Sequence, residues 1–162
     1  MGEFDSVDEI LEFAIFREDE ANDFYKILAG RVANPALAEL ILEFAKEERE
    51  HKMKLEFEIM KRGRVVDNGE RAEEARKLGE FDTAAYIVED GGSLEMDYED
   101  LLIVGMKKEK ASFRLYTELA AIVRDAEFRE TLLSLAEEEA RHKVQLEMDY
   151  HEYMLKRKSG EG

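Results

Sequence analysis

The chain has 162 residues, 44% of them apolar, which is enough to bury the core of one ordinary domain over residues 1–162. It contains no cysteine, which excludes disulfides, thiolate metal sites and iron–sulfur clusters within this chain. Its net charge of −16, from 40 acidic and 24 basic residues, would repel nucleic acid and anionic membranes and attract cations.

The start of the chain, Met1 to Asp5, lacks the basic segment and apolar run of a signal peptide. No stretch approaches the ~18 apolar residues that span a bilayer. We therefore expect a cytoplasmic protein that binds neither membranes nor nucleic acid.

Helical spacing of apolar residues predicts a first hairpin over residues 6–62, with helices at about 6–32 and 35–62. Between them, Asn34 is a predicted N-cap and Pro35 lies in the first turn of the second helix, where its missing N–H costs nothing. The positions predicted to face inward are Val7, Leu11, Ala14, Glu18, Ala21, Tyr25, Leu28 and Val32, then Leu37, Ile41, Phe44, Glu48, His51 and Leu55.

The connector over residues 63–96 contains several glycines and is longer than a tight turn needs, so we expect it to cross the bundle, with a short helix around residues 70–78. A second hairpin over residues 97–158 follows, with helices at about 97–123 and 126–158. Its predicted inward positions are Tyr98, Leu102, Gly105, Glu109, Ser112, Tyr116, Leu119 and Val123, then Phe128, Leu132, Leu135, Glu139, His142, Leu146 and Tyr153. The sequence thus predicts an all-α four-helix bundle with a long crossover between its second and third helices.

Two short motifs place a glutamate and a histidine three residues apart on predicted helices: Glu48 with His51, and Glu139 with His142. Side chains three apart on a helix point the same way, so each motif can present both groups to one point. A lone glutamate lies thirty residues before each motif, Glu18 and Glu109 respectively. Four carboxylates and two imidazoles from four helices are the ligand set of ferritin-like di-iron proteins.

The four glutamates lie at inward positions, where an unpaired ionised carboxylate costs several kcal/mol of desolvation. Two divalent cations would balance their four negative charges and leave two neutral imidazoles as further donors. The midpoints between Glu18 and Glu48 and between Glu109 and Glu139 fall in the two predicted turns, so each hairpin brings its acids level, ~22 Å from the turn. We therefore predict a two-metal site near the middle of the bundle.

The repeat extends beyond these motifs, because a shift of 91 positions also superimposes other residues of the two hairpins. We interpret this as duplication of one helical hairpin. The matched pairs are Tyr25 and Tyr116, Leu28 and Leu119, Ala45 and Ala136, Glu47 and Glu138, Lys52 and Lys143, and Leu55 and Leu146.

With these paired motifs, the chain resembles the rubrerythrin branch of the ferritin-like superfamily over essentially its full length. The resemblance implies that Glu18 and Glu109 are terminal carboxylates, Glu48 and Glu139 bridge the metals, and His51 and His142 each bind one metal. It also implies that Tyr25 and Tyr116 hydrogen-bond ligand carboxylates, and we expect both tyrosines to pack as core aromatics at the same time.

The resemblance implies two iron ions per chain, with manganese or zinc as possible substitutes, and an oxidoreductase that reduces H₂O₂ or O₂ as Fe(II) is oxidised, as in the response to oxidative stress. It further implies a homo-oligomer, expected as a dimer. Rubrerythrins carry another glutamate three residues after the third-helix ligand, where this chain has Ser112, and many carry a cysteine-rich rubredoxin-like domain, which this chain lacks. An external electron-donor protein is therefore expected.

Several alternatives stay open at this point. Glu47 and Glu138 either reach across the bundle to fix the opposite histidine, as the acid before the bridging ligand does in bacterioferritins, or lie solvated on the helix surface. Small residues beside the upstream glutamates, such as Gly105, either leave room for metals and an oxidant or allow close packing. His151 faces away from His142 and is not expected to be a ligand.

Two other functions are compatible with these residues. An iron storage or delivery protein would use a ferroxidase site of the same composition, within a large hollow assembly. A degenerate bundle that binds a partner would keep its metals for structure alone, but so complete a buried ligand set is costly to retain without metal chemistry.

Overall fold

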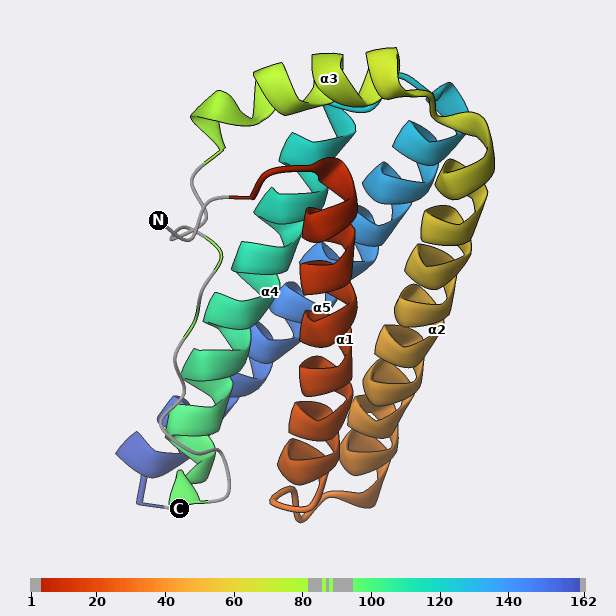
Figure 1. The fold of residues 1–162 in the computed structure, drawn as a ribbon. Coiled ribbons are helices and arrows are strands. Elements are labelled where there is room, and N and C mark those ends of the chain that lie inside the picture. Colours follow the sequence, from red (N-terminus) through yellow and green to blue (C-terminus); the bar gives the residue numbers. More distant parts are fainter. Residues whose placement is uncertain (1–3, 82–85, 87, 89–94, 161–162) are drawn as a thin grey trace.

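Four long helices form the body of the molecule in the computed structural model, which describes residues 4–81, 86, 88 and 95–160 (Figure 1). They are α1 (Val7–Ala29), α2 (Pro35–Val65), α4 (Tyr98–Ala120) and α5 (Ala126–Lys158). Each is antiparallel to both of its neighbours, and the closest packing lies within the hairpins α1–α2 and α4–α5. This arrangement confirms the predicted all-α bundle with a crossover between its second and third long helices.

Side chains define where the helices begin. Asn34 accepts hydrogen bonds from the backbone N–H groups of Ala36 and Leu37 at 2.9 and 3.3 Å, as expected for the predicted N-cap before Pro35. Ser6 and Asp125 cap α1 and α5 in the same way. These bonds satisfy N–H groups that have no partner within the helix.

Two helices end three residues earlier than predicted, because the chain leaves the helix to make the hairpin turns. Helix α1 ends at Ala29 and α4 at Ala120. In the second turn, the Arg129 guanidinium donates to the carbonyl oxygens of Ala120 and Val123, at 3.2 and 2.8 Å. These bonds stabilise the turn, because the last carbonyl groups of a helix have no hydrogen-bond partner within that helix.

Helix α2 instead continues three residues beyond the predicted end at Arg62. The Arg62 side chain is buried and pairs with Glu74 of α3 (Asn68–Lys77) through two bonds of 2.6 and 3.1 Å. It also donates to Asp8 of α1, at 3.1 Å. Helix α3 and the 3₁₀ turn Leu78–Glu80 therefore lie across one end of the bundle, where the sequence predicts a short helix at 70–78 (Figure 1).

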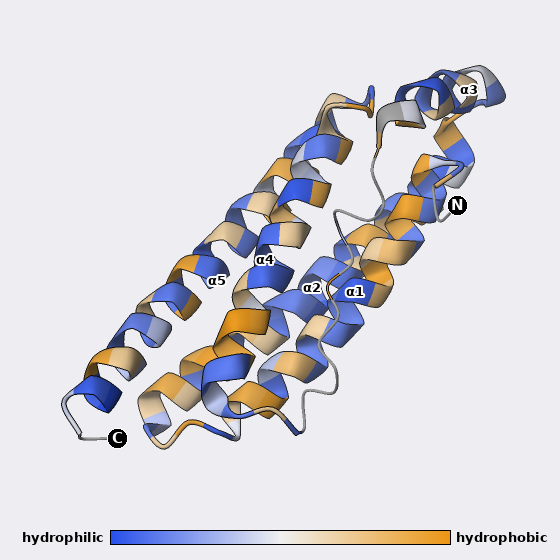
Figure 2. Cartoon of the chain, turned by 90° about the vertical axis from the view of Figure 1, so that its left-hand side faces the viewer, coloured by the Kyte–Doolittle hydropathy of each residue, from blue (hydrophilic) through white to orange (hydrophobic). Residues whose placement is uncertain are grey.

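Apolar side chains fill the bundle in two clusters, and the predicted metal-binding residues lie between them along every long helix. One cluster contains Leu11, Leu55 and Phe128, and the other contains Phe24 and Leu146. Every position predicted to face inward is buried or partly buried. Each long helix carries both hydrophobic and hydrophilic residues along its length, as an amphipathic bundle requires (Figure 2).

Gly105 allows close helix packing, which was one of its two predicted roles. A Cβ atom at this position would lie 2.9 Å from Leu146 Cδ1 and 3.1 Å from Phe24 Cε1, so the space beside it is filled by side chains. Gly105→Ala should therefore lower the free energy of unfolding by about 1–3 kcal/mol through overpacking. Denaturant unfolding would measure this change.

Gly63 is the matched control, because it also lies in a helix and a Cβ atom there meets nothing within 4 Å. Gly63→Ala should leave the protein equally stable or more stable, since alanine favours helix by about 1 kcal/mol over glycine. Equal destabilisation by both changes would contradict the packing role of Gly105.

None of the helices in the described part of the chain combines the length and the apolar composition that a bilayer crossing requires.

Candidate metal centre

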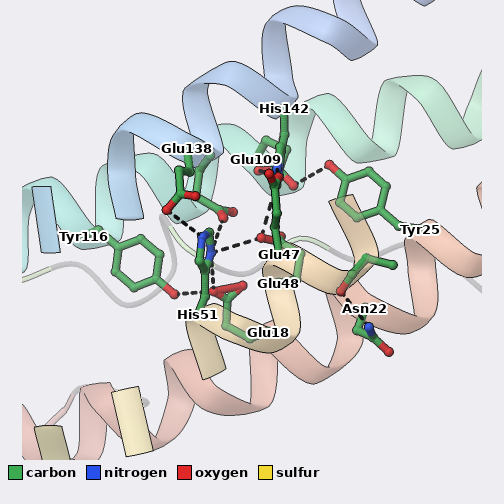
Figure 3. A network of polar contacts seen from close by, with 12 residues as sticks. Glu18, Asn22, Tyr25, Glu47, Glu48, His51, Glu109, Tyr116, Glu138 and His142 are labelled. Carbon is green, nitrogen blue, oxygen red and sulfur yellow. Dashed lines mark hydrogen bonds and ion pairs between the residues drawn. The ribbon is translucent and has the colours of Figure 1, made fainter. Parts of the chain in front are cut away.

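The six predicted donors lie together between the two apolar clusters of the bundle. Figure 3 shows Glu18, Glu48, His51, Glu109 and His142 pointing toward one another. Each is at most 3% exposed to solvent, which is unusual because glutamate is rarely buried fully unless it is paired or bound. Helix α1 supplies Glu18, α2 supplies Glu48 and His51, α4 supplies Glu109, and α5 supplies Glu139 and His142.

The donors form two overlapping groups of four. In each group, one candidate ligand atom from every residue lies within 4.8 Å of the others. Glu48 and Glu139 belong to both groups, whereas each histidine and each upstream glutamate belongs to one. The groups are Glu18, Glu48, His51 and Glu139, and Glu48, Glu109, Glu139 and His142.

Several buried atoms of these residues have no hydrogen-bond partner within the protein. They are both carboxylate oxygens of Glu48, one oxygen each of Glu109 and Glu139, and Nδ1 of His142. Buried polar atoms are normally satisfied, and leaving one unpaired costs about 1–3 kcal/mol. All five belong to residues of the two donor groups, so the residues present fit a pair of bound cations.

Both histidine rings turn Nδ1 toward the buried carboxylates and Nε2 toward an acid of the opposite helix. Nε2 of His51 lies 3.1 Å from Glu138, and Nε2 of His142 lies 2.6 Å from Glu47. A carboxylate can only accept, so Nε2 of each ring carries a hydrogen and Nδ1 is the nitrogen that would bind a metal. At His51 the metal would displace the proton that the neighbouring carboxylates hold on Nδ1. Glu47 and Glu138 thus reach across the bundle, and the surface alternative for them does not hold.

Two buried tyrosines hydrogen-bond the upstream glutamates across the bundle. The Tyr25 hydroxyl of α1 donates to Glu109 at 2.5 Å, and the Tyr116 hydroxyl of α4 donates to Glu18 at 2.9 Å. Burial and the nearby carboxylate charges raise the pKa of both phenols well above 10, so they remain donors. Each tyrosine also packs in the core, and it therefore fills both of its predicted roles.

The cluster has a strongly negative potential. Burial, together with the charges of neighbouring glutamates, raises the pKa of Glu48 and Glu139 well above 4.5. Burial lowers the pKa of His51, but the attraction of the Glu139 and Glu18 carboxylates, 2.8 and 3.1 Å from Nδ1, outweighs it and raises that pKa to about 11. The negative potential that keeps protons on these residues also attracts metal ions. Its electrostatic energy with a divalent cation is twice that with a proton at the same place.

Two contacts beside the cluster were not predicted. Arg141, inside the second motif, donates to both oxygens of Glu47 at 2.9 and 3.1 Å. Asn22 donates to the Ala45 carbonyl at 2.7 Å and joins α1 to α2 next to the site. Both are contacts between helices, so a sequence pattern along one helix could not reveal them. His151 is exposed and belongs to neither group of donors, as predicted.

Comparison with known proteins adds a family and a structural relative. The family model described as Rubrerythrin matches residues 9–150, which include all six buried donors. A hypothetical protein from Pyrococcus furiosus has a similar solved structure, with a TM-score of 0.67 and 25% sequence identity over 89% of this chain and 87% of that chain. No curated protein matches this chain.

Proposed function

Because this chain belongs to the rubrerythrin family, we propose that its six buried donors bind two iron ions and that it is a di-iron oxidoreductase. Glu18 and His51 would bind one ion, and Glu109 and His142 the other. Glu48 and Glu139 would bridge them. The observation that carries this proposal is the overlap of the two donor groups in these two glutamates.

The composition of the site supports iron. Carboxylate oxygens outnumber imidazole nitrogens, which favours iron or manganese over copper, whose preferred sites are richer in nitrogen and sulfur. Four glutamates also balance four positive charges and would stabilise the higher charge of oxidised ions. Manganese and zinc would fit the same donors as substitutes.

The proposed reaction is the reduction of a small oxidant. Two ferrous ions held by these residues would supply one electron each, and two electrons with two protons convert H₂O₂ into two waters. The residues of the chain would keep bulk water out and hold the donors in place. Tyr25 and Tyr116 fix the terminal carboxylates, and Glu47 and Glu138 fix the imidazole rings.

Anaerobic loading with Fe(II), followed by metal counting and stopped-flow absorbance, tests the proposal. We expect two irons per chain and rapid oxidation on mixing with H₂O₂ or with O₂. Comparing the two oxidants shows which one the site prefers.

Other outcomes would contradict the proposal. Uptake well beyond two irons per chain would support the storage alternative, in which the site only oxidises iron on its way to a mineral. Two bound irons that neither oxidant changes would support a purely structural role. A homodimer and a separate electron-donor protein stay predictions from the sequence.

A further inference from the structure

The two halves of the site differ in charge at several positions related by the 91-residue repeat, and at one of these, position 141, the charged side chain contacts an acid that supports a histidine. One guanidinium nitrogen of Arg141 donates to both oxygens of Glu47, and one of these oxygens, Oε2, also lies 2.6 Å from Nε2 of His142. The equivalent of Arg141 in the first hairpin is Glu50, and the equivalent of Glu47 is Glu138. Glu138 contacts His51 but forms no ion pair with a lysine or arginine of the described residues. One supporting carboxylate is therefore neutralised and the other is not.

Packing holds the Arg141 charge close to His142. The Phe44 ring stacks on the His142 ring, with centroids 4.1 Å apart, and the Arg141 guanidinium lies 5.9 Å from the Phe44 centroid. The repeat places Leu135 at the position equivalent to Phe44. The stack of His142, Phe44 and Arg141 therefore has no equivalent in the other half of the site.

The buried carboxylates also surround the two histidines unequally. Nδ1 of His51 lies 2.8 Å from Glu139 and 3.1 Å from both Glu18 and Glu48. Nδ1 of His142 lies 3.7 Å from its two carboxylate neighbours, Glu48 and Glu109. More carboxylates therefore lie close to Nδ1 of His51 than to Nδ1 of His142, and once a cation has displaced their protons they attract it more strongly there.

We propose that the two metal subsites are inequivalent, that the first divalent cation binds at His51, and that Arg141 is a positioning residue that sets this order. The inference rests on the proposed metal centre and deepens it. A positive charge at position 141 disfavours a cation at the nearer subsite, whereas the negative charge at position 50 favours one at the other. Both act through exposed side chains, so each effect is modest and is screened by salt.

The charge-swapped variant Glu50→Arg/Arg141→Glu tests this inference directly, because it exchanges the two charges and leaves composition and net charge unchanged. Both residues are exposed, so the fold should be kept. With Zn²⁺ as a diamagnetic probe, NMR of ¹⁵N-labelled histidine follows each subsite separately, since the chain has only three histidines. His151, which is exposed, is an internal reference.

In the unaltered protein at low salt, substoichiometric Zn²⁺ should shift His51 before His142. The swap should change the ratio of bound His51 to bound His142 roughly five- to tenfold toward His142. This change should shrink as salt is added. The control Glu39→Arg/Arg64→Glu swaps two exposed charges near the ends of α2, far from the site, and should leave the ratio unchanged.

The possible failures are distinguishable. If both histidines shift together, or if the swap moves the ratio less than twofold, the inference is overturned while the metal centre stands. If Zn²⁺ shifts neither histidine, the metal centre itself is overturned, and the inference with it.

Discussion

Glu48→Gln/Glu139→Gln should abolish binding of a metal pair. These two residues alone belong to both groups of donors, and their buried oxygens include three that have no partner within the protein. Glutamine has nearly the same shape, so the change removes two negative charges without opening a cavity. We expect the second ion to be lost entirely and the affinity for the first to fall at least ~100-fold, as for loss of a buried charged partner.

Metal counting after equilibrium dialysis against Fe(II), Mn²⁺ or Zn²⁺ measures this effect. The control Glu43→Gln/Glu137→Gln removes the same amount of charge from two exposed positions on the same two helices. It should still bind two ions per chain. An unchanged stoichiometry in the Glu48 and Glu139 variant would remove the bridging assignment.

Loading with metal should raise the unfolding temperature by about 10–20 °C. Each ion present at a hundredfold excess over its dissociation constant adds about 2.7 kcal/mol, and each kcal/mol is worth about 2–4 °C in a chain of this size. Bound ions would also satisfy the buried atoms of Glu48, Glu109, Glu139 and His142 that have no partner. Calorimetry with and without a chelator measures the shift, and a shift under about 3 °C would argue against paired ions.

The unfolding temperature of the metal-free protein should fall as the pH rises. Glu48 and Glu139 have pKa values well above their ordinary value of 4.5 in the folded chain, and the pKa of His51 is raised to about 11. Groups of this kind stabilise the fold below their unfolded pKa, and that contribution is lost as pH rises through the folded pKa. The metal-free protein should therefore become less stable from pH 5 to pH 8.

Metal ions displace these protons and should bind more tightly over the same range, so the difference in unfolding temperature between loaded and metal-free protein should widen with pH. A metal-free stability that rises across this range would contradict the proposed burial of ionisable donors. The Glu48→Gln/Glu139→Gln variant should show a weaker pH dependence than the unaltered chain.

The sequence predicted the fold and the convergence of the site because both depend on periodicity. Glu18, Glu48, Glu109 and Glu139 interrupt apolar stripes at equal distances from two turns, and antiparallel hairpins then bring them level. The 91-residue repeat adds a second copy of each motif. Those relations hold along single helices, where the sequence is most informative.

Contacts between helices were harder to predict. The reach of Glu47 to His142 was one of two open alternatives, since its burial depends on how closely α2 and α5 approach. The ion pair of Arg62 with Glu74 was not predicted, because the position of α3 over the bundle end depends on tertiary packing. The role of Gly105 likewise depended on the size of its neighbours, Leu146 and Phe24.

Anomalous X-ray scattering from crystals loaded anaerobically with Fe(II) tests the central claim most directly. Comparing data collected above and below the iron absorption edge identifies the bound metal as iron and gives its position, and this does not require any measurement of activity. We predict two peaks per chain, one beside Glu18 and His51 and one beside Glu109 and His142, with Glu48 and Glu139 in contact with both. A single peak, no peak, or iron bound only at surface carboxylates would contradict the account.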